Sequence, residues 1–154
     1  MTPAILAAQR AGIPFSIHEY AHDPAAGSYG REAAEALGVD PTRVFKTLIA
    51  SVDGRLIVAL VSAEQTLDLK ALAAAVGGKR ARMAPQGDAE RATGYVVGGI
   101  SPLGQKRALP CVMDGSALRG EEMFVSAGRR GLEMELAPGD LQRVLQARVA
   151  AIGR

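Results

Sequence analysis

The feature that most constrains the fold is a pair of apolar segments separated by Asp53-Gly54. Val44 to Val52 and Arg55 to Val61 are both rich in apolar and β-branched residues. An Asp-Gly pair favours a two-residue turn in which both residues adopt positive φ, and such a turn joins antiparallel strands. The sequence therefore predicts a β-hairpin over 44–61, which places a sheet within the fold.

Helix and strand signals alternate along the rest of the chain without a strict strand–helix–strand repeat. Thr2-Pro3 and Ser28 are typical helix starts, and Gly12 and Gly38 are typical helix ends. We expect helices over 3–11, 28–37, 67–76, 85–92 and 138–150, strands over 13–17, 79–83, 111–114, 121–126 and 132–136, and a loop over 94–107. This order predicts one mixed α/β domain spanning 1–154, built around a single sheet flanked by helices.

The composition excludes several classes of protein. Apolar residues make up 48% of the 154 residues, and no apolar run reaches the ~18 residues of a membrane span. Cys111 is the only cysteine, which excludes a disulfide framework. Since the first residues also lack a signal-peptide pattern, we expect a cytoplasmic protein. The net charge of +2 and the absence of Trp argue against a large duplex-binding surface and against base stacking.

A possible zinc motif occurs at His18-Glu19-Tyr20-Ala21-His22, which matches the H-E-x-x-H pattern of zinc proteases. That pattern binds zinc on a helix, where side chains four residues apart share one face. Pro14 and Pro24 bracket the motif, and the alternation before it predicts a strand, on which the histidines would stand ~13 Å apart. Glu32 and Glu35 are the available third ligands, but this spacing argues against zinc. We therefore expect neither a metal site nor a metalloprotease.

Lys46 lies in the middle of the first hairpin strand, between apolar neighbours. With a period of two, Val44, Lys46 and Leu48 point to one face, and Phe45 and Thr47 point to the other. An ammonium group buried without a partner is strongly destabilising. Lys46 therefore either binds an anionic or carbonyl-bearing ligand, or extends its charge to water while its aliphatic stem packs. The periodicity leaves both alternatives open.

The segment from Thr93 to Arg107 is rich in glycine. It is not a phosphate-binding P-loop, because Gln105 stands where that motif requires lysine. Gly98-Gly99, followed by Ser101-Pro102, would let a ligand approach backbone N–H groups, which can stabilise charge at an ester. An ordinary tight turn is the alternative. No nucleophile triad is visible and Cys111 fits a core position, so an enzyme here would work by binding, orientation and electrostatics.

Together these segments resemble the YbaK/EbsC family, free-standing relatives of the editing domain found in bacterial prolyl-tRNA synthetases. The resemblance covers nearly the whole chain in one register, and the Gly-Gly-Ile-Ser-Pro block at 98–102 is its most specific part. The matching segments are Thr2-Pro3-Ala4, Ile13-Pro14-Phe15, His18, Tyr20, His22-Asp23-Pro24, Glu32-Ala33-Ala34, 44–48, 93–95, 97–106, Val125-Ser126, Arg130-Gly131-Leu132, Pro138 and Asp140-Leu141.

The resemblance implies a mixed α/β fold with a curved, partly barrel-like sheet, and no cofactor or metal. It also implies an enzyme that removes a wrongly attached amino acid from tRNA, with Lys46 as the catalytic residue. The implied substrate-binding residues are Tyr20, Tyr29, Thr47, Gly98, Gly99, Ile100, Ser101, Pro102 and Ser126. Ala127-Gly128 departs from the Gly-Gly expected there, which weakens the match beside Ser126.

We therefore expect a trans-editing deacylase that clears mischarged tRNA, with Cys-tRNA(Pro) as its substrate. Lys46 would donate to the aminoacyl carbonyl or to a neighbouring ribose or phosphate oxygen, and N–H groups near Gly99 and Ile100 would hold the ester. The cysteinyl thiol or a water molecule would attack. The alternatives are Ala-tRNA(Pro) or another aminoacyl-tRNA as substrate, and a non-catalytic tRNA-binding module on the same fold.

The expected partners are the acceptor end of misacylated tRNA(Pro) and prolyl-tRNA synthetase, which would supply selectivity for that tRNA. Short basic clusters at 79–82, 106–107 and 129–130 either contact the acceptor stem or are solvated surface. The modest net charge predicts weak intrinsic affinity for tRNA, with a steep dependence on salt.

Overall fold

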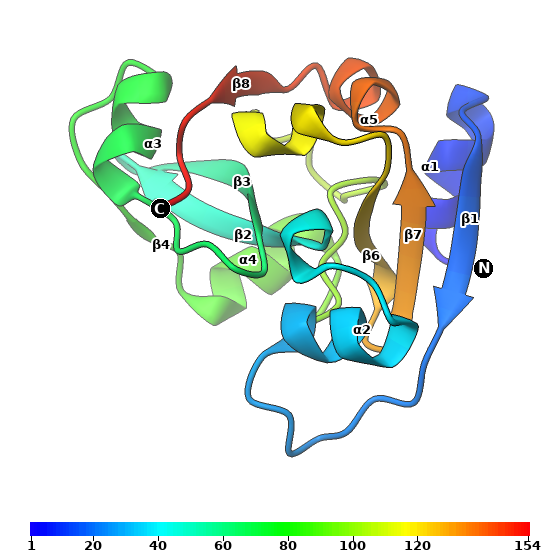
Figure 1. The fold of residues 1–154 in the computed structure, drawn as a ribbon. Helices are drawn as coiled ribbons and strands as arrows, with labels where there is room; N and C mark the ends of the chain where they lie inside the picture. The colour runs from blue at the N-terminus through cyan, green and yellow to red at the C-terminus, as the bar shows by residue number, and fades with distance from the viewer.

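The strands form two sheets in a computed structural model that describes all 154 residues (Figure 1). The first sheet is antiparallel and has the order β1 (Phe15–Glu19), β7 (Leu132–Leu136), β6 (Met123–Arg129). The second has the order β4 (Ala81–Met83), β2 (Phe45–Val52), β3 (Arg55–Ser62), β5 (Cys111–Asp114), β8 (Arg148–Ala150). In the second sheet β4, β2 and β3 are antiparallel neighbours, and β3, β5 and β8 are parallel.

Helices cover the outside of the sheets (Figure 1). They are α1 (Pro3–Ala11), α2 (Tyr29–Leu37), α3 (Leu69–Ala75), α4 (Gln86–Thr93) and α5 (Pro138–Leu145), and short 3₁₀ turns occupy Pro41–Arg43 and Gly115–Arg119. The predicted caps are confirmed for the first two helices. The Thr2 hydroxyl accepts the Ile5 N–H at 3.2 Å, and the Ser28 hydroxyl accepts the Arg31 N–H at 3.4 Å.

The predicted hairpin is confirmed. Strands β2 and β3 pair along their whole length, from Phe45 opposite Ser62 to Val52 opposite Arg55. Asp53 and Gly54 form the turn with φ values of 49° and 84°. Positive φ at both positions is what the Asp-Gly pair favours in a two-residue turn.

The expectation of a single sheet is wrong, and the barrel-like curvature is not confirmed. Backbone pairing links the two sheets only at one isolated parallel bridge, between Val44 and Phe124, and no closed barrel forms. The strands themselves were visible in the sequence as alternating or apolar runs. Which strand edges come together depends on the packing of distant segments, which periodicity does not report.

The expectation of one helix over 138–150 is wrong beyond Leu145. Gln146 adopts a left-handed conformation with φ 51°, which ends α5, and 148–150 then pairs as β8 with β5. Arg148 also donates to the Ala75 carbonyl oxygen at 2.7 Å. Pairing with β5 therefore overrides a local sequence that suits a helix.

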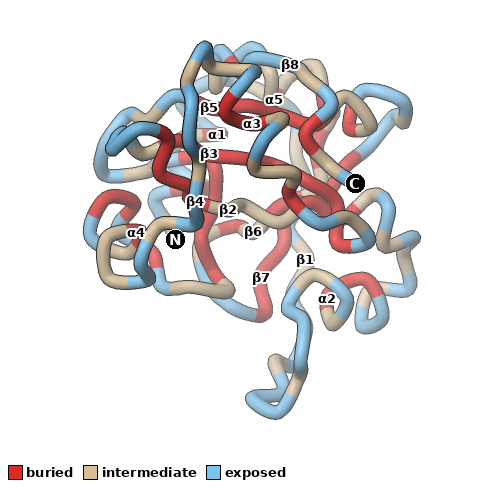
Figure 2. Tube along the Cα trace, turned by 90° about the vertical axis from the view of Figure 1, so that its left-hand side faces the viewer, coloured by how far each residue is buried: buried red, intermediate tan, exposed pale blue.

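The main core contains residues from both sheets and from α1 and α5. Figure 2 shows β3, β6 and β7 mostly in the colour of buried residues. Its largest fully buried members are Phe45, Leu60, Leu103, Met113, Met123, Met134, Leu136 and Leu141. A second cluster lies between the larger sheet and α3, around Leu72 and Ile152. No helix combines the length and apolar character that crossing a bilayer requires.

Candidate active site

A cavity of about 600 Å³ opens against a free stretch of the β2 edge. On the side away from β3, β4 pairs with Ala50 to Val52, and Val44 meets Phe124 in the bridge between the sheets. No strand pairs with 46–48 on that side, and these residues line the cavity. The gap between the two sheets therefore forms the cavity, which we call the Lys46 cavity.

Lys46 reaches this cavity half-buried and without a carboxylate partner. It takes part in no ion pair and no side-chain hydrogen bond. Burial, and then the nearby positive charge of Arg31, lower the pKa of the Lys46 ammonium. An ammonium in this setting favours an anionic or carbonyl-bearing ligand, because such a ligand would satisfy its unused donors.

Thr47 and Tyr20, two residues that carry hydroxyl groups, also line the Lys46 cavity. The Thr47 Oγ1 atom is buried and has no hydrogen-bond partner within the protein. A buried hydroxyl left unpaired is destabilising by about 1–3 kcal/mol. Because the Thr47 Oγ1 atom has almost no accessible surface, a ligand in the cavity could bond to it only if the wall moved. Tyr20 lines the opposite wall, where burial, followed by the charges of Glu133 and Glu32, raises its pKa to about 12. Tyr20 therefore stays a neutral donor at physiological pH.

Some residues of the glycine-rich loop line the Lys46 cavity, and others hold the loop in place. Gly98 and Ile100 line the cavity, and neither donates its backbone N–H to a protein acceptor. Gly99, Ser101 and Pro102 do not line it. The Gly99 N–H donates to the Val96 carbonyl oxygen at 2.9 Å, so the expectation that this N–H holds an ester is wrong. The available donors are those on either side of Gly99.

The support residues hold this loop against the β6–β7 hairpin and the core. A Cβ atom at Gly99 would lie 2.8 Å from the Arg129 Cα atom, so only glycine allows this approach. Ser101 is fully buried, and its hydroxyl accepts the Leu103 N–H at 3.2 Å. The Tyr95 hydroxyl donates to the Leu103 carbonyl oxygen at 2.6 Å. These contacts give the loop a fixed position beside the cavity.

Tyr29 forms part of the cavity rim, as the sequence predicted. A Cβ atom added at Gly98 would lie 2.7 Å from the Tyr29 ring. The Arg130 guanidinium stacks on this ring, with its Cζ atom 5.2 Å from the ring centroid. Arg130 also donates to the Val97 carbonyl oxygen, which joins the hairpin after β6 to the glycine-rich loop. In the sequence, Arg130 belongs to a basic cluster and to a segment that matches the family, and neither indicates this stacking contact between distant segments.

The Glu133 carboxyl was missed at the sequence level. It lies opposite Ser126 in the β6–β7 pairing, is 7% exposed, and lines the Lys46 cavity together with Ser126. Burial raises the pKa of Glu133 to about 8, so this carboxyl is mostly protonated at neutral pH. In the sequence it alternates with core residues in the same way as Glu135, and this pattern is typical of a solvent-facing glutamate. Its burial depends on how the segments around the Lys46 cavity cover that part of β7, which the alternation does not report.

The structure keeps the two histidines of the H-E-x-x-H motif apart. His18 lies in β1 and pairs with Glu135 at 2.8 Å, while His22 lies beyond the strand and pairs with Glu32 at 2.8 Å. The predicted strand is confirmed, with bounds shifted by two residues. Nowhere in the chain do three His, Cys, Asp or Glu side chains gather in a way that could hold an ion.

Cys111 lies in the main core, away from the Lys46 cavity. Burial raises the pKa of its thiol to about 12, so Cys111 does not supply a thiolate nucleophile at neutral pH. No cysteine or histidine lines the Lys46 cavity. The wall offers an ammonium, hydroxyls, one carboxyl and backbone N–H groups, which are suited to binding and polarising a carbonyl group.

Comparison with known proteins identifies the family. A family model described as the aminoacyl-tRNA editing domain matches residues 23–144. The chain belongs to this family. EbsC of Enterococcus faecalis, whose name gives Cys-tRNA(Pro)/Cys-tRNA(Cys) deacylase as its proposed activity, is 35% identical over 153 residues, covering 98% of this chain and 92% of EbsC. The resemblance found in the sequence is thereby confirmed.

Further relatives fit the same family. The multifunctional Ser/Thr-tRNA deacylase ProXp-y of Escherichia coli is 31% identical over 106 residues, covering 66% of this chain and 64% of ProXp-y. The solved structure of a protein assigned as a trans-editing enzyme for prolyl tRNA synthetase superposes with a TM-score of 0.87. It is 26% identical and covers 99% of this chain and 95% of its own. The predicted mixed α/β class is therefore confirmed.

Proposed function

We propose that this editing domain is a trans-acting deacylase that clears Cys-tRNA(Pro), with the aminoacyl end of the tRNA bound in the Lys46 cavity. The observation that carries the proposal is the convergence of unused donors on one cavity without a cysteine or histidine. These donors are the Lys46 ammonium and the N–H groups of Gly98 and Ile100. The activity named for EbsC supports the choice of substrate.

In this proposal the protein orients the ester and stabilises charge. Lys46 and the free loop N–H groups would donate to the aminoacyl carbonyl oxygen as negative charge develops on it. The substrate thiol sulfur attacks the carbonyl carbon to form an S–C bond, and the bond from that carbon to the ribose oxygen breaks. The thiol proton ends on the departing ribose oxygen. A water molecule takes the place of the thiol with other amino acids.

ProXp-y supports a second candidate substrate. Its name assigns it Ser/Thr-tRNA, and the polar wall at Glu133 would accept a serine hydroxyl as well as a thiol. Ala-tRNA(Pro) is the third substrate to compare. As for partners, the trans-editing assignment of the related structure supports prolyl-tRNA synthetase, and tRNA as substrate supports a cytoplasmic location.

The test is the release of amino acid from Cys-, Ser- and Ala-tRNA(Pro) assayed side by side. We expect the fastest release from Cys-tRNA(Pro), and we expect Lys46→Ala to lower kcat/KM by about 100-fold or more, as removal of one oxyanion donor does elsewhere. Lys70→Ala, at an exposed lysine in α3, is the matched control, and Cys111→Ala should also remain active. Circular dichroism checks that each variant is folded. Unchanged release by folded Lys46→Ala would rule out the proposed role of the lysine.

A further inference from the structure

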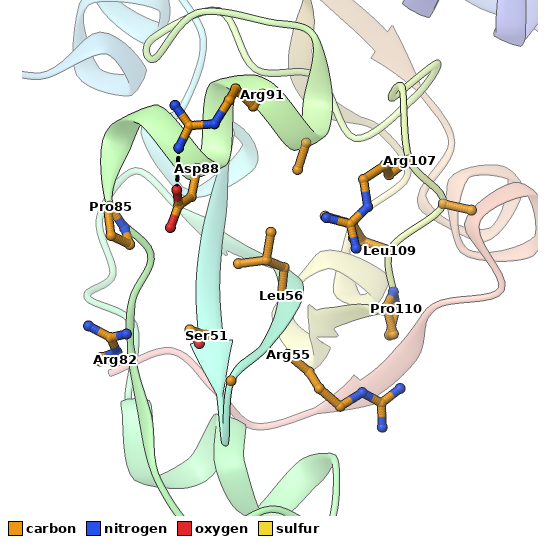
Figure 3. A pocket seen from close by; sticks show the side chains of 13 residues that line it. Ser51, Arg55, Leu56, Arg82, Pro85, Asp88, Arg91, Arg107, Leu109 and Pro110 are labelled. Atoms are coloured by element: carbon orange, nitrogen blue, oxygen red, sulfur yellow. Dashed lines mark hydrogen bonds and ion pairs between the residues drawn. The ribbon is translucent and has the colours of Figure 1, made fainter.

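A second cavity, of about 660 Å³, is ringed by four arginines from four different parts of the chain (Figure 3). Arg55 begins β3, Arg82 lies in β4, Arg91 lies in α4, and Arg107 precedes β5. All four are exposed. Figure 3 shows Arg91 and Arg107 on the upper rim, Arg82 and Arg55 on the lower rim, and Leu56 between them. We call this cavity the arginine hollow.

Most of the positive charge around the arginine hollow is unbalanced. Arg91 pairs with Asp88, the only carboxylate that lines the hollow. Arg55, Arg82 and Arg107 make no ion pair and no side-chain hydrogen bond. Like charges gathered around one hollow repel each other, and an anion bound there would relieve the repulsion. Guanidinium groups match phosphate oxygens in geometry and in charge.

The lining favours a phosphate backbone over a protein surface. Only four of the thirteen lining residues are apolar, and no aromatic residue is among them. The centre of a protein interface is typically apolar, rich in aromatic residues and poor in charge. Phosphodiester groups, in contrast, are bound by arginine and lysine side chains that need no apolar core.

The arginine hollow and the Lys46 cavity lie on two sides of α4. Gln86 and Ala89 line the Lys46 cavity, whereas Asp88 and Arg91 line the arginine hollow. Strand β4 is divided in the same way, with Met83 on one side and Arg82 on the other. An α-helix is about 10 Å wide, which corresponds to about three nucleotides at ~3.4 Å per nucleotide along one strand of a duplex.

We propose that the arginine hollow binds backbone phosphates of the tRNA acceptor arm, a few nucleotides from the ester held in the Lys46 cavity. This inference rests on the proposed function, because it takes the ester to be at Lys46. It adds a second point of attachment to the same tRNA, made by Arg82 and Arg107 on opposite sides of the hollow and by Arg55 and Arg91 beside them. Phosphate binding of this kind provides affinity and position without reading the base sequence.

The test compares the double variant Arg82→Gln/Arg107→Gln with the native protein. Binding of uncharged tRNA(Pro) is measured from 50 to 300 mM salt, and we expect the slope of log K against log salt to fall by about two, at ~0.9 for each phosphate that is no longer bound. The control is Arg10→Gln/Arg119→Gln, which removes the same charge from exposed arginines elsewhere on the surface. Arg82→Lys/Arg107→Lys should keep most of the slope, since the charge remains.

A short substrate separates this inference from the proposed function. Cysteine esterified to adenosine alone occupies the Lys46 cavity and carries no phosphate, so the native protein and the double variant should cleave it at equal rates. If the native protein cleaves neither the short ester nor Cys-tRNA(Pro), the proposed function is wrong. If the native protein cleaves both the short ester and Cys-tRNA(Pro), but the double variant has the same slope of log K against log salt as Arg10→Gln/Arg119→Gln, the proposed phosphate site is wrong. A normal slope together with weakened binding of prolyl-tRNA synthetase would instead make the hollow a protein-docking surface, and would also overturn the proposal.

Discussion

Glu133 is the only carboxyl group on the wall of the Lys46 cavity, and burial gives it a raised pKa of about 8. In the unfolded chain a glutamate loses its proton near pH 4.5. Between these values the unfolded state holds fewer protons than the folded state, so the free energy of unfolding falls as pH rises. The decrease begins near pH 4.5 and is complete above about pH 8.

We predict that Glu133→Gln removes this component of the pH dependence, because the amide stays neutral. Between pH 5.5 and 7.5 the native protein should lose up to about 2 kcal/mol of unfolding free energy that the variant keeps. Urea unfolding at the two pH values measures the difference. Glu121→Gln is the control, at an exposed glutamate without partners. Equal pH dependence in Glu133→Gln and the native protein would contradict a buried, protonated carboxyl.

At the level of single residues, several of the site residues expected from the sequence lie on continuous motifs and line the same cavity. Lys46 and Thr47 share a strand, Gly98 and Ile100 share a loop, and all four line one cavity. Glu133 was missed because its position depends on the β6–β7 hairpin packing beside the loop. Gly99 belongs to the same specific motif as Gly98 but serves as a support. A motif shows that a segment is constrained, but it does not show which of its atoms face a ligand.

Among the structural elements, the glycine-rich loop depends most on close packing against another element. Gly104 has φ 67°, and a Cβ atom there would lie 2.4 Å from the Pro3 carbonyl oxygen at the start of α1. Gly12, which ends the same helix, has a similar φ of 69° but nothing within 4 Å. The two glycines thus separate the energetic effect of left-handed backbone from that of a steric clash.

We predict that Gly104→Ala lowers the free energy of unfolding by about 3 kcal/mol, and Gly12→Ala by about 1 kcal/mol. Both variants bear the strain of a left-handed alanine, and Gly104→Ala also pushes α1 away from the loop. Urea unfolding of both variants gives the comparison. Equal decreases would show that α1 yields to the methyl group without strain.

The predicted ends of helices and strands agree best with the structure where turn or cap residues mark them in the sequence. The Asp53-Gly54 turn and the capped helices α1 and α2 lie where the sequence predicted them, since turn and cap residues act on their own neighbours. The predicted helix over 67–76 is shorter at both ends, because Asp68 caps it by accepting the Ala71 N–H at 3.0 Å. Strand β8 could not be predicted, since its existence depends on β5 offering a free edge.

For the whole molecule, Asp114 fastens the end of the chain to the larger sheet. Its carboxylate accepts the backbone N–H groups of Ile152 and Gly153 at 3.0 and 2.8 Å, and it also accepts from Ser116 and Gln65. Burial acts to raise the pKa of Asp114, but these donors outweigh it and leave the pKa lowered. The carboxylate therefore contributes stability that is lost as pH falls through its folded-state pKa.

We predict that Asp114→Ala lowers the free energy of unfolding by about 3 kcal/mol, because it leaves buried N–H groups unpaired. Hydrogen exchange at 148–154 should accelerate more than exchange at 45–52. Asp23→Ala, at an exposed carboxylate that caps only its own turn, provides the control. Unchanged exchange at the C-terminal residues would show that β8 pairing alone holds them.

The position of α4 has one more consequence for the molecule. The width of this helix separates the Lys46 cavity, where the ester would react, from the arginine hollow, where a phosphate would bind. A free amino-acid ester or an aminoacyl adenylate is too short to occupy the Lys46 cavity and the arginine hollow at the same time. The domain would therefore bind an amino acid on tRNA more tightly than the same amino acid on a short ester, which it would still cleave but with a higher KM.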